Sequence, residues 1–363
     1  MINVLGFTPK YDCSASYRLI NPSNLFSGSR LHIAYSNSIS TSLIAECDAL
    51  IILRASLHED IISLAKTAKQ LGKKVIFDMD DIMWDLPWGY SLEEEGHFVT
   101  EEKRKGILSN LARYLDAITC STEELRNRAR NDLDLANVNV LHNFSHITGK
   151  VHPIITPVEK KIVLQGDERH AYYDWLQLKD AQLLEEENPE NEDSPNVPTN
   201  ILLAIFGMPD DMYMSYGFKC KTEWWPQVKL NFFYQTMERI SAGVGLAPLH
   251  PGLAINQCKS IIKLLEYSKL GMSVVASPVG EYKQCPDAYF AKSSAEWVEQ
   301  IKIALKKPNA EAVNKWRKGW DKEAHKGWFD FFSKFFGEKL EVKGNQIVSD
   351  IETQGGPDGQ ASK

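Results

Sequence analysis

No apolar run of this chain approaches the ~18–20 residues that a membrane-spanning helix needs. The N-terminus begins directly with a strand-like stretch, Ile2 to Phe7, which leaves no room for a signal peptide. The six cysteines show no CxxC spacing, so neither a zinc site nor a disulfide framework is indicated. These absences predict a cytoplasmic protein with reduced thiols, and they leave peripheral contact with a membrane open.

An excess of positive charge is also missing, because 41 Lys and Arg residues face 48 Asp and Glu residues, for a net charge of −7. A broad nucleic-acid surface needs a basic face, so we expect none. The sequence contains no Walker-type phosphate loop and no Ser-His-Asp order that suggests a hydrolase. With 363 residues, 43% of them hydrophobic and 25% charged, the chain has an ordinary globular composition and the length of two domains.

The first half of the chain alternates short apolar strands with helical segments, which is typical of a parallel sheet covered on both faces. An amphipathic pattern predicts a helix from His58 to Leu71, and Gly72 is its expected stop. Ser121-Thr122-Glu123-Glu124 is a capping box and predicts the start of another helix. The sequence predicts strands around these helices at residues 48–54, 74–78, 117–120 and 138–143.

A second α/β unit follows a proline-containing linker around residues 151–160. Its first strand is expected at 161–166, and further strands at 201–207, 244–249 and 273–278. The polar stretch 185–200 predicts a solvated surface loop. We therefore divide the chain into a first domain (1–155), a second domain (156–305), an aromatic-rich helical segment (306–337) and a disordered tail (338–363).

The stretch from Asn256 to Tyr267 is the most informative part of the sequence. If residues 258–270 form one helix, Lys259, Lys263 and Glu266 fall on one stripe. The unpaired N–H groups at the start of such a helix, together with two lysines, form an anion site that suits a diphosphate. Glu266 is then placed to accept hydrogen bonds from ribose or sugar hydroxyls. A surface helix with a solvated Lys/Glu face is the alternative that the spacing leaves open.

The residues around this stretch resemble the nucleotide-binding segment of GT-B glycosyltransferases of family 4. The similar pattern runs from about Ala242 to Tyr282. It has an apolar strand ending in Pro-Leu, then Asn-x-x-Lys-Ser-x-x-Lys-x-x-Glu-Tyr, then Leu-Gly-x-x-Val-Val-Ala-Ser. The family's Glu-x7-Glu pair is present only in part, because Glu266 matches the second glutamate and Cys258 occupies the position of the first. This departure bears on the identity of the donor sugar rather than on the nucleotide site.

The resemblance implies an α/β fold of two Rossmann-like domains whose parallel sheets face a cleft, with a C-terminal helix that packs back on the first domain. It also implies transfer of a sugar, with retention of configuration, from a nucleotide-diphosphate sugar to a saccharide or other hydroxyl acceptor. No metal or other cofactor is expected. The family's Gly-Ser-x-x-His-x-x-x-Asp pattern is matched by Gly166, His170 and Asp174, with Asp167 in place of the serine.

By this resemblance the second domain holds the donor and the first domain faces the acceptor. The residues assigned to the donor are Gly166, Arg169, His170, Lys259, Ser260, Lys263 and Glu266. The residues assigned to the acceptor side are Arg18, Arg54, Asp80 and Asp81. Those assigned to catalysis are Lys259, Lys263, Glu266, Asp80 and Asp81, the lysines because they stabilise charge on the departing diphosphate. No separate base is named, because the resemblance implies that the diphosphate itself takes the proton.

Three other interpretations stay open. The run from Val75 to Asp81 also resembles the first motif of haloacid-dehalogenase-type phosphatases, with Asp78 as nucleophile, Asp80 as acid/base and a bound Mg²⁺. The same carboxylates resemble the metal site of GT-A glycosyltransferases. Against the phosphatase, no glycine follows Asp80, and the strand is not the first of its domain. The third interpretation is a catalytically weakened GT-B scaffold, because Cys258 replaces a glutamate and the N-terminal glycine-rich loop is missing.

Overall fold

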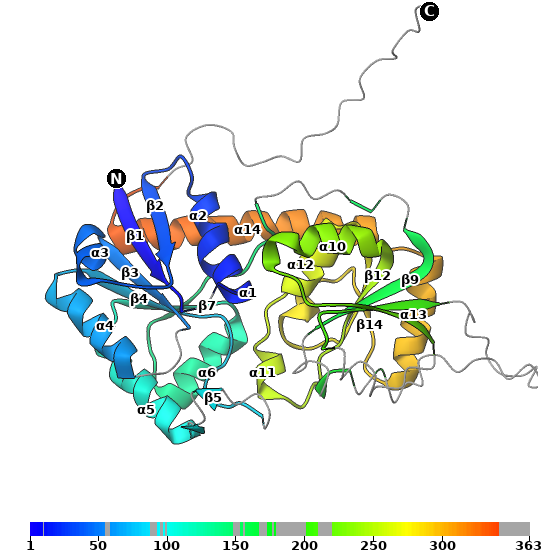
Figure 1. Cartoon of the computed structure of the whole chain (residues 1–363), viewed down its shortest axis with the longest axis horizontal. Coiled ribbons are helices and arrows are strands. Elements are labelled where there is room, and N and C mark those ends of the chain that lie inside the picture. The colour runs from blue at the N-terminus through cyan, green and yellow to red at the C-terminus, as the bar shows by residue number, and fades with distance from the viewer. Residues whose placement is uncertain are drawn as a thin grey trace, which may run out of the picture.

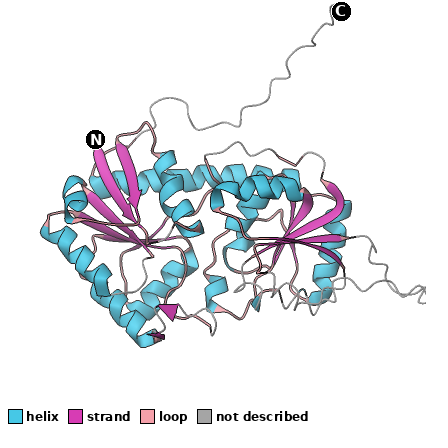
Figure 2. Cartoon of the chain, in the orientation of Figure 1, coloured by secondary structure: helices cyan, strands magenta, loops and turns pink. Residues whose placement is uncertain are grey.

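The computed structural model describes residues 1–9, 11–54, 59–87, 93–94, 97–98, 100–147, 153–154, 157–166, 173–175, 178, 201–209 and 220–340. Within these residues the chain forms two six-stranded parallel sheets, each flanked by helices (Figure 1). Helices and strands largely alternate along the chain, as is typical of an α/β protein (Figure 2). Among the helices so described, none combines the length and the apolar character needed to cross a membrane.

The first sheet has the strand order β2-β1-β3-β4-β7-β8. Its strands are β1 (Ile2–Phe7), β2 (Leu31–Ser36), β3 (Ala49–Leu53), β4 (Lys74–Met79), β7 (Ala117–Cys120) and β8 (Val138–Val140). All residues of β3 and β7 are buried, because helices cover both faces of the sheet and each strand is a continuous apolar run. The helices of this domain are α1 (Cys13–Ala15), η1 (Ser16–Ile20), α2 (Asn21–Leu25), α3 (Thr41–Glu46), α4 (Glu59–Gln70), α5 (Glu101–Ala112) and α6 (Glu123–Leu133).

The second sheet has the order β11-β10-β9-β12-β13-β14. Its strands are β9 (Val158–Gln165), β10 (Leu202–Phe206), β11 (Lys221–Trp225), β12 (Ala242–Ala247), β13 (Ser273–Ala276) and β14 (Tyr289–Phe290). The accompanying helices are η2 (Leu230–Phe232), α10 (Phe233–Ile240), α11 (Ala254–Gln257), α12 (Ile262–Lys269), η3 (Gly280–Gln284) and α13 (Ser294–Lys306). A Cβ at Gly245 in β12 would lie 2.5 Å from the ring of Tyr267, so glycine at this position lets α12 pack closely on the sheet. A small separate ribbon pairs β5 (Glu93–Glu94) with β6 (His97–Phe98).

Helix α14 (Ala310–Phe336) joins the two domains, and in Figure 1 it runs in orange along both of them. Its first part packs in the core of the second domain through Val313. Its last part packs in the core of the first domain, where Trp328 and Phe332 lie among residues of β1, β2 and η1. The expectation that a C-terminal aromatic helix packs back on the first domain is therefore confirmed.

The predicted strands at 48–54, 74–78 and 117–120 are confirmed as β3, β4 and β7, and the predicted helix from residue 58 is α4. The helix predicted after the capping box is α6, but its cap is Thr122, whose hydroxyl accepts from the Leu125 N–H. The strand expected at 138–143 is shorter, because β8 ends at Val140. The domain boundaries stay a prediction, and the polar loop 185–200 lies outside the described residues.

Candidate functional site

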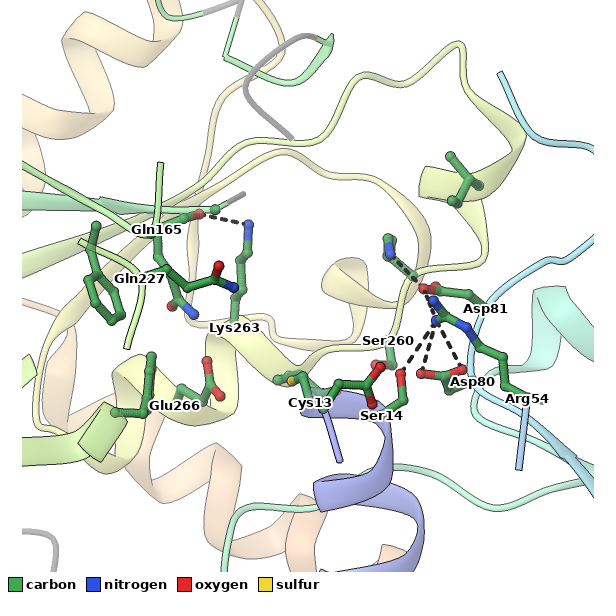
Figure 3. A pocket seen from close by; sticks show the side chains of 18 of the residues that line it. Cys13, Ser14, Arg54, Asp80, Asp81, Gln165, Gln227, Ser260, Lys263 and Glu266 are labelled. Atoms are coloured by element: carbon green, nitrogen blue, oxygen red, sulfur yellow. Dashed lines mark hydrogen bonds and ion pairs between the residues drawn. The ribbon is translucent and has the colours of Figure 1, made fainter. Parts of the chain in front are cut away.

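A cavity of about 470 Å³ lies between the two domains. It forms where parallel strands of both sheets end, since Arg54 follows β3, Asp80 follows β4, and Gly166 follows β9. Ligands of α/β proteins bind at this edge of a parallel sheet. Figure 3 shows charged and polar side chains entering the cavity from both domains, among them Ser14, Arg54, Asp80 and Asp81 from the first and Gln165, Gln227, Ser260, Lys263 and Glu266 from the second.

The helix predicted over 258–270 is wrong at its start, because the chain breaks between α11 and α12. Helix α11 ends at Gln257, and α12 begins at Ile262, so Lys259 and Ser260 lie in the connection. The break has a physical cause in the first domain. The Cys258 side chain is fully buried in that domain's core, and its carbonyl accepts a hydrogen bond from Thr122 at 3.1 Å. Cys258 therefore serves the contact between domains and does not line the cavity.

The start of α12 opens on the cavity, and no side chain caps its first turn within the described part of the chain. Just before the helix, the Ile261 N–H donates to Glu281 Oε2 at 3.0 Å. Lys263, in the first turn, lines the cavity and donates from Nζ to the Gln165 carbonyl at 2.9 Å. The positive end of the helix dipole and a lysine thus point at the same space, which favours an anion there.

Asp80 and Asp81 are held by cations from both domains. The Arg54 guanidinium lies 3.3 Å from Asp80 and 3.1 Å from Asp81, and Lys259 of the second domain lies 2.8 Å from Asp81. Burial raises the pKa of Asp80, but Arg54 and the Ser14 hydroxyl more than offset this, so that the pKa is lowered overall. Asp80 is therefore ionised at neutral pH, and its charge is balanced by Arg54. Among the residues described, no cluster of His, Cys, Asp and Glu has the arrangement of a metal site.

Glu266 lines the cavity and is 2% exposed. The Tyr17 hydroxyl of the first domain donates to its Oε1 at 2.8 Å. Its Oε2 is buried without a hydrogen-bond partner among the described residues. Burial raises the pKa of Glu266 to about 7, although Tyr17 and the charge of Lys263 act in the opposite direction. Near neutral pH this carboxyl is present in both charge states, so it is able to donate or to accept a hydrogen bond.

Arg18 and Asp78 lie outside the cavity and form a buried ion pair. The guanidinium donates to both carboxylate oxygens of Asp78, at 2.8 and 2.7 Å, and neither residue is more than 2% exposed. Thr119 donates a further hydrogen bond to Asp78 at 2.6 Å. Arg18, assigned to the acceptor side, is therefore part of the first domain's core in this structure. Asp78 has no access to a substrate, which leaves the phosphatase interpretation without its nucleophile.

The remaining predicted site residues have different outcomes. Gly166 lines the cavity, whereas Arg169 and His170 lie outside the described residues. Asp174 is fully buried and accepts hydrogen bonds from the Asn256 side chain at 2.6 Å and from the His250 N–H at 2.8 Å. Asp174 thus fixes the segment that leads into α11. The sequence does not single out Tyr17, Asn143 or Gln165. Each is recognised only from the cavity residue that it contacts, which is Glu266, Ser260 or Lys263 respectively.

No protein-family model matches the chain. No curated protein matches it either.

Several solved structures do share the fold of this chain. An α-glucosyltransferase (AGT) in complex with UDP has a TM-score of 0.57 at 12% identity, over 93% of this chain and 100% of that chain. HepE of Anabaena, in complex with UDP and glucose, has a TM-score of 0.55 at 10% identity, over 93% and 100%. A TarM mutant of S. aureus has a TM-score of 0.50 at 12% identity, over 80% of this chain. This chain spans 55% of that TarM chain. The chain has the GT-B fold.

Proposed function

We propose that the protein is a glycosyltransferase that moves a sugar from a nucleotide-diphosphate sugar to an acceptor hydroxyl. One observation carries this proposal: the start of α12, with Ser260 and Lys263, opens on a cavity whose opposite wall is the acidic edge of the first domain. Lys263 at a helix start suits a diphosphate, and carboxylates paired with Arg54 on the first-domain side suit hydroxyl groups, as the two substrates of such a transfer require. We further propose the family 4 branch on the resemblance of residues 242–282.

The donor diphosphate is placed at the start of α12. Backbone N–H groups at a helix start bind phosphate oxygens, and Lys263 adds a positive charge beside them. Lys259, held by Asp81 at 2.8 Å, is close enough to the same wall to move onto a phosphate. These groups stabilise the charge that grows on the leaving diphosphate, and one well-placed donor of this kind is worth about 3 kcal/mol of barrier. UDP is the nucleotide we propose first, because it is bound in the AGT and HepE structures.

Glu266 is assigned to the ribose or the sugar. Glu266 lines the cavity, and its Oε2 is buried without a hydrogen-bond partner among the described residues, so we propose that a hydroxyl of the ligand donates to it. Burying a carboxyl without such a partner is unfavourable, so binding of a hydroxyl there adds affinity and orientation. In this assignment Tyr17 holds one carboxyl oxygen in place while the ligand takes the other.

The acceptor is assigned to the first domain, near Asp80 and Asp81. Arg54 already pairs with both carboxylates, so we propose that they bind hydroxyl groups and that no divalent cation is required. The resemblance to family 4 implies retention, with the acceptor attacking from the face that the diphosphate leaves and the diphosphate taking its proton. NMR of the anomeric proton of the product tests retention directly.

A thermal-shift screen with UDP, GDP, ADP and CMP, each with Mg²⁺ and with EDTA, tests the proposal. A nucleotide at a hundred times its dissociation constant stabilises the folded protein by about 2.7 kcal/mol, which is a readily measured shift. We expect a shift with one nucleoside diphosphate that persists in EDTA and that falls to about half or less in Lys263→Ala. Lys306→Ala is the control, because Lys306 is exposed at the end of α13. No shift with any nucleotide would contradict the proposal and favour the scaffold.

A further inference from the structure

Asn143 links the buried Arg18 to the cavity residue Ser260. Arg18 Nη1 donates to Asn143 Oδ1 at 3.0 Å, and Asn143 Nδ2 donates to Ser260 Oγ at 2.9 Å. Asn143 is fully buried and belongs to the segment after β8, whereas Ser260 belongs to the connection before α12. The chain of hydrogen bonds therefore starts in the core of the first domain and ends at the donor wall of the second.

The direction of each hydrogen bond in this chain is fixed by chemistry. A guanidinium has only donors, so the oxygen of the Asn143 amide must face Arg18 and the NH₂ group must face Ser260. An amide NH₂ group cannot accept, so Ser260 Oγ is the acceptor and its own proton must point elsewhere. Among the described residues, the Ser260 hydroxyl has no acceptor of its own, and Ser260 lines the cavity.

Arg18 is itself held rigidly. Asp78 binds two of its nitrogens, and the Leu141 carbonyl accepts from the third, so the guanidinium plane cannot turn away from Asn143. The guanidinium carbon also lies 4.9 Å from the ring centroid of Trp328 in α14. The backbone carbonyl of Asn143 accepts from Trp320 Nε1 at 2.8 Å, which anchors the residue a second time. A rigid amide at this position can orient a hydroxyl with little loss of entropy on binding.

We propose that Asn143, held by Arg18, is a positioning residue that turns the Ser260 hydroxyl into a dedicated hydrogen-bond donor toward the diphosphate. This inference rests on the proposed function. It adds a residue of the first domain that influences binding of the nucleotide sugar through Ser260. Asn143 and Ser260 belong to different domains. The Ser260 hydroxyl is therefore directed toward the diphosphate only when the two domains are in the contact seen here.

The variants Ser260→Ala, Asn143→Asp and the double variant test this with UDP as the probe in isothermal titration calorimetry. If the thermal-shift screen selects another nucleoside diphosphate, that compound replaces UDP. Asn143→Asp keeps an acceptor for Arg18, so it should fold, but its second oxygen accepts the Ser260 proton and withdraws it from the cavity. Uridine, which lacks the diphosphate of UDP, is the control ligand.

We expect Ser260→Ala to weaken UDP binding roughly tenfold, as for a lost hydrogen bond to a charged group, and Asn143→Asp to weaken it at least as much. In the Ser260→Ala background the effect of Asn143→Asp should shrink, because no hydroxyl proton remains to be withdrawn. Uridine affinity should not change. Asn143→Ala, a second variant, should weaken UDP binding several-fold and add nothing in the Ser260→Ala background.

Two results would overturn the inference while leaving the proposed function intact. One is an equal loss of UDP affinity from Asn143→Asp with and without the Ser260 hydroxyl, which would make its effect independent of Ser260. The other is a parallel loss of uridine affinity, which would make Asn143 merely structural. If the wild-type protein binds no nucleoside diphosphate at all, the proposed function itself fails, and this inference fails with it.

Discussion

Tyr17 of the first domain donates a hydrogen bond to Glu266 of the second, with 2.8 Å between the phenol oxygen and Oε1. Their side chains are almost completely buried, at 0% and 2% exposure. Burial raises the pKa of Glu266 to about 7, so the bond joins the domains through a carboxyl that titrates near neutrality. The charge of the cavity and the contact between the domains are therefore coupled at this pair.

Replacing Tyr17 by Phe should destabilise the protein, because Glu266 Oε1 loses its hydrogen-bond donor in a buried place. A loss of about 1–3 kcal/mol in the free energy of unfolding is expected for a buried acceptor left unsatisfied. The loss should be larger near pH 8 than near pH 5, because the charged carboxylate needs the donor more than the neutral acid does. Urea unfolding of both proteins at the two pH values measures it.

The control for this variant is Tyr289→Phe. The Tyr289 hydroxyl donates to the Lys307 carbonyl at 2.7 Å at an exposed place, where water can replace it. Its removal should change the unfolding free energy by less than about 0.5 kcal/mol at either pH. A Tyr17→Phe effect as small as the control would mean that the bond to Glu266 contributes little.

Glu266 should make the wild-type protein less stable as the pH rises. Its pKa in the folded protein is about 7, against an ordinary value of 4.5, so the folded state binds this proton more tightly. Its contribution to stability is fully present below about pH 4.5 and is lost as the pH rises through 7. This pKa shift corresponds to a contribution on the order of 3 kcal/mol to the free energy of unfolding.

Glu266→Gln should lose this part of the pH dependence, measured as the difference in unfolding free energy between pH 5 and pH 8. An unchanged pH dependence would contradict the assignment.

The sequence predicted the layers of the fold well, because strands buried on both faces are continuous apolar runs that can be recognised locally. It also located a segment, residues 259–266, that lines the cavity between the domains. It did not predict the break at residues 258–261, since the cause is Cys258 packing in the core of the other domain. Nor could it pair Tyr17 with Glu266, 249 residues apart, or Asn143 with Ser260, 117 residues apart. Such pairs depend on how the two domains meet.

The Arg18–Asp78 pair illustrates the same limit. The resemblance assigned Arg18 to the acceptor side, but the fold buries both partners of the pair. Asp78→Asn should destabilise the protein by about 3–5 kcal/mol, because a buried guanidinium loses its counter-charge. Lys69→Ala, which breaks the half-exposed pair of Lys69 with Asp116, should change stability by less than about 1 kcal/mol. Equal effects in urea unfolding would show that the buried pair is not needed by the fold.

Asp81 should restrain Lys259 in the protein without bound nucleotide sugar, because the two side chains form an ion pair at 2.8 Å between the two domains. Asp81→Asn should therefore release Lys259 and tighten UDP binding several-fold, while it slows transfer if the carboxylate binds the acceptor. The combination of a lower Kd with a lower kcat separates this role from general damage to the site. Weaker UDP binding in Asp81→Asn would contradict the assignment of Lys259 to the diphosphate.

The most direct test of the account is calorimetric titration of UDP, in EDTA, into wild-type protein, Lys263→Ala and Lys306→Ala. We expect binding to the wild type and to Lys306→Ala with equal affinity, and a loss of roughly tenfold or more in Lys263→Ala, because a charged partner of the diphosphate is removed. GDP, ADP and CMP are titrated in the same way if UDP gives no heat. If no nucleotide binds the wild type, or if Lys263→Ala binds as tightly as Lys306→Ala, the start of α12 is not a diphosphate site.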